Sequence, residues 1–325
     1  MKASLEDLLR LAFAPSTRAT YAAALSRFKQ FCLLHRIPAL PADKETIIYF
    51  TVTMSRALSP ATIKVYLSAI SSWHQQNGYK SPTSHNPMLS LIIKGARKQH
   101  AFKSNRKSTR QPITARILKH MLQEVWKPSY HLCQHDKRML AAAFTLAFFG
   151  LLRISEFTVP SKQSFNPRKH ASVTSIKWKE DHFIFTIKSS KTDQFRYGQA
   201  LYITKSRREI CPFTAMRRYF CSHGLDKSLK HAPLFSFKNG QPLTRHSCLK
   251  HMRSILAAAG YQPLTFNTHS FRIGAATSAA QAGIPTAQIK LLGRWHSSAY
   301  QCYTRTGKKA LKSAASSLAN IAASK

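Results

Sequence analysis

The sequence has few acidic residues and many basic ones. Only 12 Asp and Glu oppose 50 Lys and Arg among the 325 residues, which gives a formal net charge of +38, and no acidic residue follows Asp226. Metal-dependent phosphodiester chemistry needs clustered carboxylates, and a chain so short of them has difficulty building such a cluster. A field of this sign attracts polyanions, so the composition predicts nucleic-acid binding.

Three further absences narrow the class of protein. No apolar run approaches the roughly 20 residues that span a bilayer. Residues 1–16 lack the order of a signal peptide and indicate a short amphipathic helix, and the chain has no internal repeat or low-complexity block. Periodic apolar segments throughout argue against a small ribosomal or chromatin protein, and scattered bases argue against a membrane-surface helix. We expect a globular nucleic-acid-binding protein with no membrane partner.

The six cysteines form no Cys-x-x-Cys pair. Widely spread cysteines indicate reduced thiols in an intracellular compartment, and we expect the nucleus. Two groupings combine cysteine with histidine, but neither has the spacing of a zinc finger, so we expect no metal ion. The first grouping is Cys211 with Cys221 and His223, and the second is His246 with Cys248 and His251.

Residues 1–99 predict an all-helical domain. Ser16 is the expected N-cap of a first long helix, and Ser59, followed by proline, predicts the start of another. One helix lies between these two, and a shorter one begins after Asn86. Residues 100–112 are polar and basic and predict an exposed linker.

Residues 113–325 mix helices and strands. Helices are expected over 113–126 and 138–153, and a helical pattern continues from Pro212 onward. Between them, three β-rich runs separated by turns predict a small antiparallel sheet. The predicted fold class is therefore mainly α with a small antiparallel β-sheet, in two domains joined by a linker. The three runs are residues 173–178, 182–188 and 199–204.

The last third of the chain is rich in Arg, His, Lys and Tyr. Such side chains can cleave a phosphodiester without a metal ion, because cations stabilise the pentavalent phosphate while a phenol attacks it. Four landmarks along the chain fit this chemistry. They are the segments around Arg153, Lys191, His269 and Tyr303.

The first two landmarks are single basic residues. Arg153 follows the most apolar segment, and Glu156 is placed either to orient it or to form an ordinary helix-terminal ion pair with it. Lys191 falls in the turn between two predicted strands, where it could protonate a leaving oxygen in a DNA groove. Lys188 competes for this role, and an isolated hairpin lysine is more often simply solvated.

The other two landmarks are short motifs. The spacing in Thr-His-Ser-Phe-Arg places His269 and Arg272 on one face at the start of a helix, where an anion is favoured. The segment Leu-Gly-Arg-Trp-His leads to Tyr300 and Tyr303, each of which could be a core aromatic or a nucleophile. No landmark is specific alone, but the four occur together and in one order.

In that order the landmarks resemble the tyrosine recombinase, or phage integrase, family. The resemblance covers nearly the whole chain, and the segments SKTDQ, HSFRIGAAT and LGRWHSSAYQCYTR are most similar to recombinases of DIRS-type and Crypton-type mobile elements. It implies a helical core-binding domain (1–99), the linker, and a mixed α/β catalytic domain (113–325). The implied activity is cleavage and rejoining of duplex DNA through a 3′-phosphotyrosine, without metal, ATP or another cofactor.

The resemblance also implies roles for the landmark residues. Arg153 and Arg272 would bind the scissile phosphate, and Lys191 would act as general acid. His269 would assist proton transfer, and Tyr303 would be the nucleophile because Tyr-Thr-Arg is similar to the family's usual ending.

One position departs from the family pattern. The family places a His or Trp nine residues before the tyrosine, where this chain has Arg294. Either Trp295 or His296 would take that role. The sequence leaves the choice open.

The resemblance further implies double-stranded DNA as partner and a homotetramer acting on two DNA sites. The amphipathic tail, residues 308–323, would dock on a neighbouring protomer or fold back on its own domain. Two other functions remain as alternatives: a domesticated DNA-binding protein without the reaction, and an enzyme similar to a type IB topoisomerase.

We expect the two domains to form a C-shaped clamp around duplex DNA. Basic residues on the N-terminal helices and in the linker would lie near phosphates, so binding should weaken steeply with salt. These residues are Lys64, Arg97, Lys98, Lys103, Arg106 and Lys107.

Overall fold

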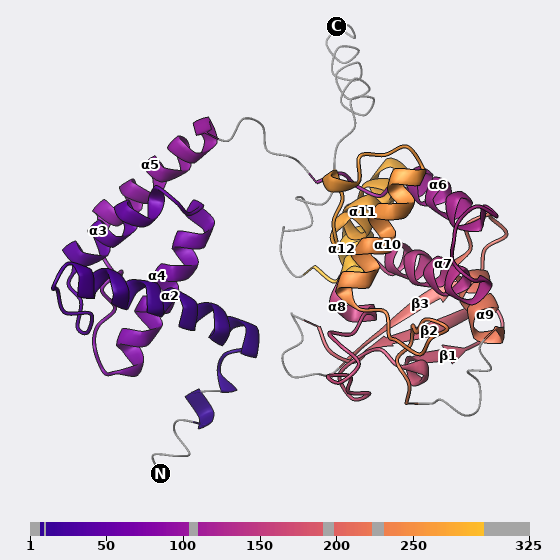
Figure 1. Ribbon diagram of the computed structural model, residues 1–325, viewed down its shortest axis with the longest axis horizontal. Helices are drawn as coiled ribbons and strands as arrows, with labels where there is room; N and C mark the ends of the chain where they lie inside the picture. The colour runs from indigo at the N-terminus through magenta and orange to yellow at the C-terminus, as the bar shows by residue number, and fades with distance from the viewer. Residues whose placement is uncertain (1–6, 10, 104–109, 191–197, 223–230, 296–325) are drawn as a thin grey trace, which may run out of the picture. The chain divides into compact units, whose positions relative to one another are not determined.

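The chain divides into two compact units, Met1–Lys107 and Ser108–Lys325. The computed structural model describes residues 7–9, 11–103, 110–190, 198–222 and 231–295 (Figure 1). Each unit has its own hydrophobic core.

Among its described residues, the N-terminal unit has four long helices. They are α2 (Pro15–Leu34), α3 (Lys44–Ser55), α4 (Pro60–Gln76) and α5 (Pro87–Lys103). Their apolar faces enclose a core that includes Phe28, Ile47, Phe50 and Ile70, all fully buried. The observed helices agree with the four expected in this half of the chain.

The ends of these helices show which local sequence signals determine where each helix begins and ends. Ser59 caps α4 as predicted, and its side chain accepts a hydrogen bond from the Thr62 backbone N–H at 3.2 Å. Ser16 is not the N-cap of α2, because Pro15 is already the first helical residue and proline, which lacks an N–H, suits that position. Helix α5 continues to Lys103, into the range predicted as linker, since residues 100–103 contain no Pro or Gly to stop it.

The second unit contains seven helices among its described residues. They are α6 (Ala115–Trp126), α7 (Gln134–Phe149), α8 (Ile154–Phe157), α9 (Pro212–Cys221), α10 (Arg245–Ala258), α11 (Ser270–Gln281) and α12 (Thr286–Gly293). Helix α7 is buried along nearly its whole length and contacts α6, α9 and α11. Because every residue from Met139 to Phe148 is buried, α7 is the central element of this unit.

A three-stranded antiparallel sheet lies beside these helices (Figure 1). Its strands are β1 (Ile176–Trp178), β2 (His182–Ile187) and β3 (Gln199–Thr204), in that order, and Phe185 of β2 lies opposite Ile176 and Leu201. Alternate residues of β2 are buried, as expected for a sheet with one face on the core. The predicted fold class, mainly helical with a small antiparallel sheet, is confirmed.

Helix α11 approaches the backbone of Ile113 very closely. The Ile113 N–H donates to the Ser270 carbonyl at 2.9 Å, and a Cβ placed on Gly274 would come within 1.7 Å of the Ile113 carbonyl oxygen. Only glycine fits there. Gly274, two positions after Arg272, therefore allows tight packing beneath the start of α11.

In the described parts of the chain, no helix is both long enough and apolar enough to span a bilayer.

Candidate active site

Four predicted site residues lie at the ends of helices in the second unit. Arg153 directly precedes α8, and His269 directly precedes α11, which carries Arg272 in its first turn. Trp295 follows α12. The structure brings these segments together around the turn that leaves α7.

Arg153 is held by a buried carboxylate. Its Nη1 donates to Glu156 Oε1 at 2.9 Å, and its backbone N–H donates to Glu156 Oε2 at 2.9 Å. The Glu156 side chain is fully buried, whereas 18% of the Arg153 side chain is exposed. No other described residue accepts a hydrogen bond from this guanidinium, so its remaining donors are available to a ligand. The predicted pairing is confirmed, although Arg153 caps the helix and does not lie on its face.

Arg272 is almost completely buried, with 1% of its surface exposed. Its guanidinium donates to the carbonyl oxygens of Leu151 and Gly293. The guanidinium carbon also lies 4.3 Å from the centroid of the Trp295 ring, a cation–π contact. Arg272 thus joins the turn after α7 to the end of α12.

His269 lies in a strongly positive environment. Burial lowers the pKa of its imidazole, and the charges of the surrounding arginines lower it further. A neutral imidazole at neutral pH can accept a proton. The arginines are Arg110, Arg272, Arg153 and Arg245.

Sequence reasoning missed two of these arginines. Arg110 comes from the segment before α6, and Arg245 is the first residue of α10. No local pattern marks either residue, because their nearness to His269 follows from the packing of distant segments. The start of α10 did carry a recognisable signal, since Thr244 accepts a hydrogen bond from the Ser247 N–H at 3.1 Å.

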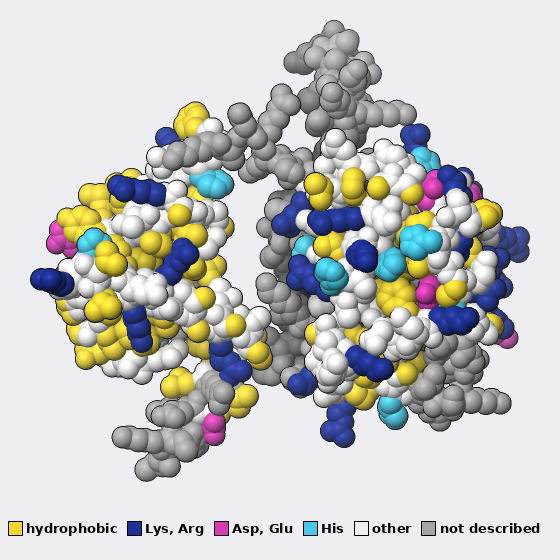
Figure 2. Space-filling view, viewed as in Figure 1, with side chains coloured by type: hydrophobic (Ala, Val, Ile, Leu, Met, Phe, Trp, Pro, Cys, Tyr) yellow, Lys and Arg dark blue, Asp and Glu magenta, His cyan; other side chains and the backbone are white. Residues whose placement is uncertain are grey.

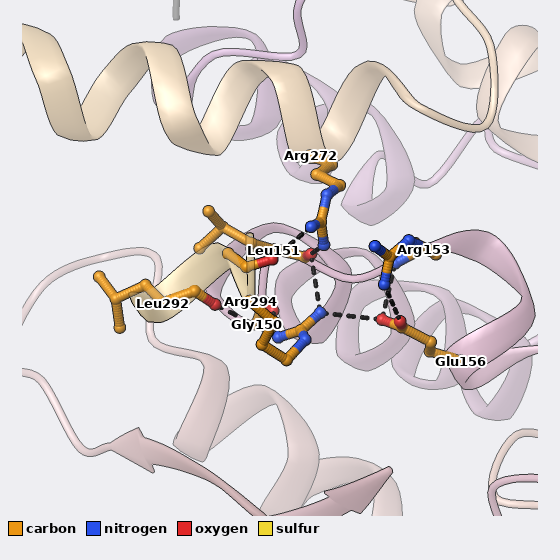
Figure 3. Close-up of polar contacts among 8 residues, drawn as sticks. Gly150, Leu151, Arg153, Glu156, Arg272, Leu292 and Arg294 are labelled. Carbon is orange, nitrogen blue, oxygen red and sulfur yellow. Dashed lines mark hydrogen bonds and ion pairs between the residues drawn. The ribbon is translucent and has the colours of Figure 1, made fainter. Parts of the chain in front are cut away.

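Arg294 is the third arginine whose place was not predicted. It points inward, with 3% of its side chain exposed, and its Nη2 lies 2.9 Å from Glu156 Oε2 (Figure 3). Its guanidinium also donates to the carbonyls of Gly150 at 2.9 Å and Leu151 at 3.1 Å. Burial lowers the pKa of Arg294, and the Glu156 carboxylate opposes that shift.

Lys188, the competitor of Lys191, has a structural environment of its own. Its Nζ donates to the carbonyl of Pro167 at 2.7 Å and to the hydroxyls of Ser172 and Thr174. Burial lowers its pKa. The hydrogen bonds of Lys188 therefore connect the end of β2 to the segment around the start of η1 (Val173–Ser175).

Several predicted residues lie outside the described residues. They are Lys191, His296 and Tyr303 of the expected catalytic set, Arg106 and Lys107 of the expected linker, and the tail segment 308–323. The side chain of Lys103 is also outside them.

The remaining predicted DNA contacts are on the N-terminal unit. Lys64 on α4 and both Arg97 and Lys98 on α5 are exposed. Figure 2 shows Lys and Arg side chains on the visible face of each unit, with few acidic side chains between them. Among the residues that the structure describes, no group of three His, Cys, Asp or Glu is arranged to hold a metal ion.

An imidazole and four guanidinium groups around it form a site suited to a phosphate. Residues 113–309 match the model of the phage integrase family. The chain belongs to this family and is a tyrosine recombinase.

Individual relatives agree with this assignment. The chain is 25% identical over 294 residues to the integrase/recombinase xerD homolog of Selenomonas ruminantium, an alignment that covers 85% of this chain and 77% of the relative. Its fold is similar to that of the XerH site-specific recombinase bound to palindromic difH substrate, with a TM-score of 0.63 and 17% identity over 92% of this chain and 78% of that one. It is also similar to the Tn1549 transposon integrase in complex with transposon right end DNA, with a TM-score of 0.60 and 14% identity over 94% of this chain and 95% of the other.

Proposed function

We propose that this protein is a site-specific DNA recombinase that cleaves and rejoins duplex DNA through a 3′-phosphotyrosine on Tyr303. The observation that carries the proposal is the convergence of Arg153, at the start of α8, with Arg272 and a half-buried His269, at the start of α11. Two guanidinium groups and an imidazole with lowered pKa are suited to a phosphate that gains negative charge as it is attacked.

The proposed reaction needs no metal ion and no ATP. The Tyr303 oxygen attacks phosphorus, the bond from phosphorus to the 5′-oxygen breaks, and Lys191 donates the proton that this oxygen takes up. His269 accepts the phenol proton. The phosphotyrosine keeps the energy of the broken bond, so a 5′-hydroxyl can reverse the step and reseal the strand.

For the position that the family gives to His or Trp, we propose Trp295. The contact between the Trp295 ring and the Arg272 guanidinium supports this choice. His296 is the competing residue, and a His296→Ala variant that loses cleavage while Trp295→Ala retains it would reverse the assignment.

Duplex DNA is the proposed substrate and partner. The formal charge of +38 supports it, and XerH and the Tn1549 integrase were both solved with DNA. The exposure of Lys64, Arg97 and Lys98 on the N-terminal unit supports a role for them in phosphate contact. A homotetramer on two DNA sites, a nuclear location and an origin in a DIRS-type or Crypton-type element remain part of the proposal, on the strength of the sequence resemblance.

Covalent trapping tests the reaction. The protein is incubated with a pool of nicked suicide DNA substrates in EDTA, in parallel with Tyr303→Phe and with Tyr300→Phe as the matched control. We expect a denaturant-resistant protein–DNA complex in the wild type and in Tyr300→Phe, and none in Tyr303→Phe. A complex that persists in Tyr303→Phe and disappears in Tyr300→Phe would move the nucleophile.

The same assay separates the alternative functions. Tight DNA binding without any trapped complex, even on the sequences that flank the gene, would indicate a domesticated DNA-binding protein. Trapping and relaxation of any supercoiled plasmid, whatever its sequence, would indicate an enzyme similar to a type IB topoisomerase.

A further inference from the structure

The guanidinium of Arg294 links three segments of the catalytic unit. It leaves the end of α12 and reaches the turn after α7, where it binds the carbonyls of Gly150 and Leu151, and it pairs with Glu156 in α8 (Figure 3). Leu151 also accepts from Arg272, so one carbonyl oxygen receives hydrogen bonds from two arginines.

The Glu156 carboxylate divides its two oxygens between two arginines. Oε1 accepts from the Arg153 side chain, and Oε2 accepts from Arg294 Nη2 and from the Arg153 backbone N–H, each at 2.9 Å. Because the side chain is excluded from solvent, water cannot replace a missing donor. The position of this carboxylate fixes the Arg153 guanidinium, and Arg294 fixes the carboxylate from its other side.

The backbone of Arg294 is held in an unfavourable conformation. Its φ of 57° and ψ of 46° are left-handed, at a helix-terminal position where glycine is usual. Leu151, which accepts a hydrogen bond from Arg294, is also left-handed, with a φ of 46°. Left-handed residues other than glycine persist where surrounding contacts determine them strongly, often at functional sites.

Arg294 does not face a ligand. Its side chain is 3% exposed, and both terminal nitrogens donate to protein acceptors. Its terminal donors are therefore used within the protein, on the turn after α7 and on Glu156.

We propose that Arg294 is a positioning residue: through Glu156 it sets the orientation of Arg153 toward the scissile phosphate. This inference rests on the proposed function. It assigns to Arg294 a task distinct from that of Trp295, which lies against Arg272.

The test compares Arg294→Lys with Arg153→Ala in single-turnover cleavage of the suicide DNA that traps the wild type. Lysine keeps the charge but cannot reach Glu156 and two carbonyls together. We expect about a 100-fold slower cleavage, the typical effect of displacing a catalytic group by a small distance. Arg253→Lys is the matched control. Like Arg294, Arg253 in α10 has a buried Nε with no hydrogen-bond partner among the described residues, and the variant should cleave at the wild-type rate.

Two readouts distinguish positioning from a general structural role. In the Arg153→Ala background, Arg294→Lys should slow cleavage no further, because the group that it positions is gone. On DNA with a neutral methylphosphonate at the scissile position, both variants should recover toward the wild-type rate, since the charge that Arg153 neutralises is absent. Effects that multiply, or an Arg294→Lys defect that the neutral substrate does not relieve, would overturn the positioning role.

The outcomes also separate this inference from the proposed function. If the wild type forms no covalent complex, or if Arg153→Ala cleaves normally, the proposed function fails. If both behave as expected and Arg294→Lys cleaves at the wild-type rate, only the role of Arg294 fails.

Discussion

The Arg272 guanidinium lies 4.3 Å from the centroid of the Trp295 ring and donates to the carbonyl of Gly293, two residues before that ring. A Cβ on Gly293 would come within 1.7 Å of the same ring. Arg272 is therefore held by a three-residue segment that fits only with glycine at its start.

Gly293→Ala should displace Trp295 and with it Arg272. We expect about a 100-fold loss of single-turnover cleavage, together with a destabilisation of about 1–3 kcal/mol from overpacking. Trp295→Phe, which keeps an aromatic ring at this position, should lose much less activity. Equal losses in the two variants would contradict the argument, as would an unchanged Gly293→Ala.

Gly274→Ala should destabilise the catalytic unit. The new methyl group would overlap the Ile113 backbone, which cannot move without breaking its hydrogen bond to Ser270. We expect a loss of at least about 1–3 kcal/mol in the free energy of unfolding, measured in urea. Gly95→Ala on α5 is the control: no atom lies within 4 Å of its Cβ, so it should leave stability unchanged or raise it by up to about 1 kcal/mol.

Glu156→Gln should be among the single changes that lower the free energy of unfolding most. It leaves the buried Arg294 without its counter-charge, and breaking a buried ion pair from one side costs about 3–5 kcal/mol. Glu209→Gln removes an exposed ion pair with Lys119; the side chain of Glu209 is 62% exposed and that of Lys119 is 44% exposed. This change should alter the free energy of unfolding by less than about 1 kcal/mol. Urea unfolding of both variants provides the comparison, and similar losses would show that Glu156 is not the buried counter-charge.

The pH dependence of cleavage should report His269. Because the pKa of this imidazole is lowered from 6.5, it stays neutral to a lower pH than a free histidine, and the cleavage rate should fall only below pH 6.5. Arg110→Gln removes one of the charges that lower this pKa, so the fall should move to higher pH. Single-turnover rates between about pH 5 and 8 test this. An unmoved profile, or one that His269→Gln leaves in place, would assign the titration to another group.

Lys64 should contribute to DNA affinity through a phosphate contact. Lys64→Ala should weaken binding to all DNA sequences alike and reduce the slope of log affinity against log salt by about 1. Lys119→Ala is the control, because Lys119 is already paired with Glu209. Titration of fluorescent duplexes at several salt concentrations gives both slopes. A slope unchanged in Lys64→Ala would place this face of α4 away from the phosphates.

The sequence predicted most of the fold because its local signals were strong. Ser59 before Pro60 determines the start of α4 by capping and by the fixed φ of proline. The β-branched and aromatic residues of β2, with turn-rich sequence on either side of it, indicate a small sheet. Local signals compete where two occur together: at the start of α2, Pro15 is the first helical residue, so the N-cap is Ala14 and not Ser16.

The site was predictable only as far as its parts are close in sequence. Arg153 and Glu156, three residues apart, form the expected pair. Arg294 and Glu156 are 138 residues apart and meet only through the packing of α12 against the turn after α7. No spacing rule identifies such a pair. The inward direction of Arg294 depends on its left-handed backbone, and an arginine in a sequence does not predict that backbone conformation.

The balance of charge around His269 and Glu156 links occupancy of the site to the stability of the fold. Five guanidinium groups (Arg110, Arg153, Arg245, Arg272 and Arg294) act on these two residues, and Glu156 is the one buried carboxylate among the described residues. Their mutual repulsion is greatest when the site is empty and falls when a phosphate binds. We therefore expect any anion that binds the site to raise the melting temperature by mass action. Under the proposed function, duplex DNA would stabilise the fold on binding as well as serve as the substrate.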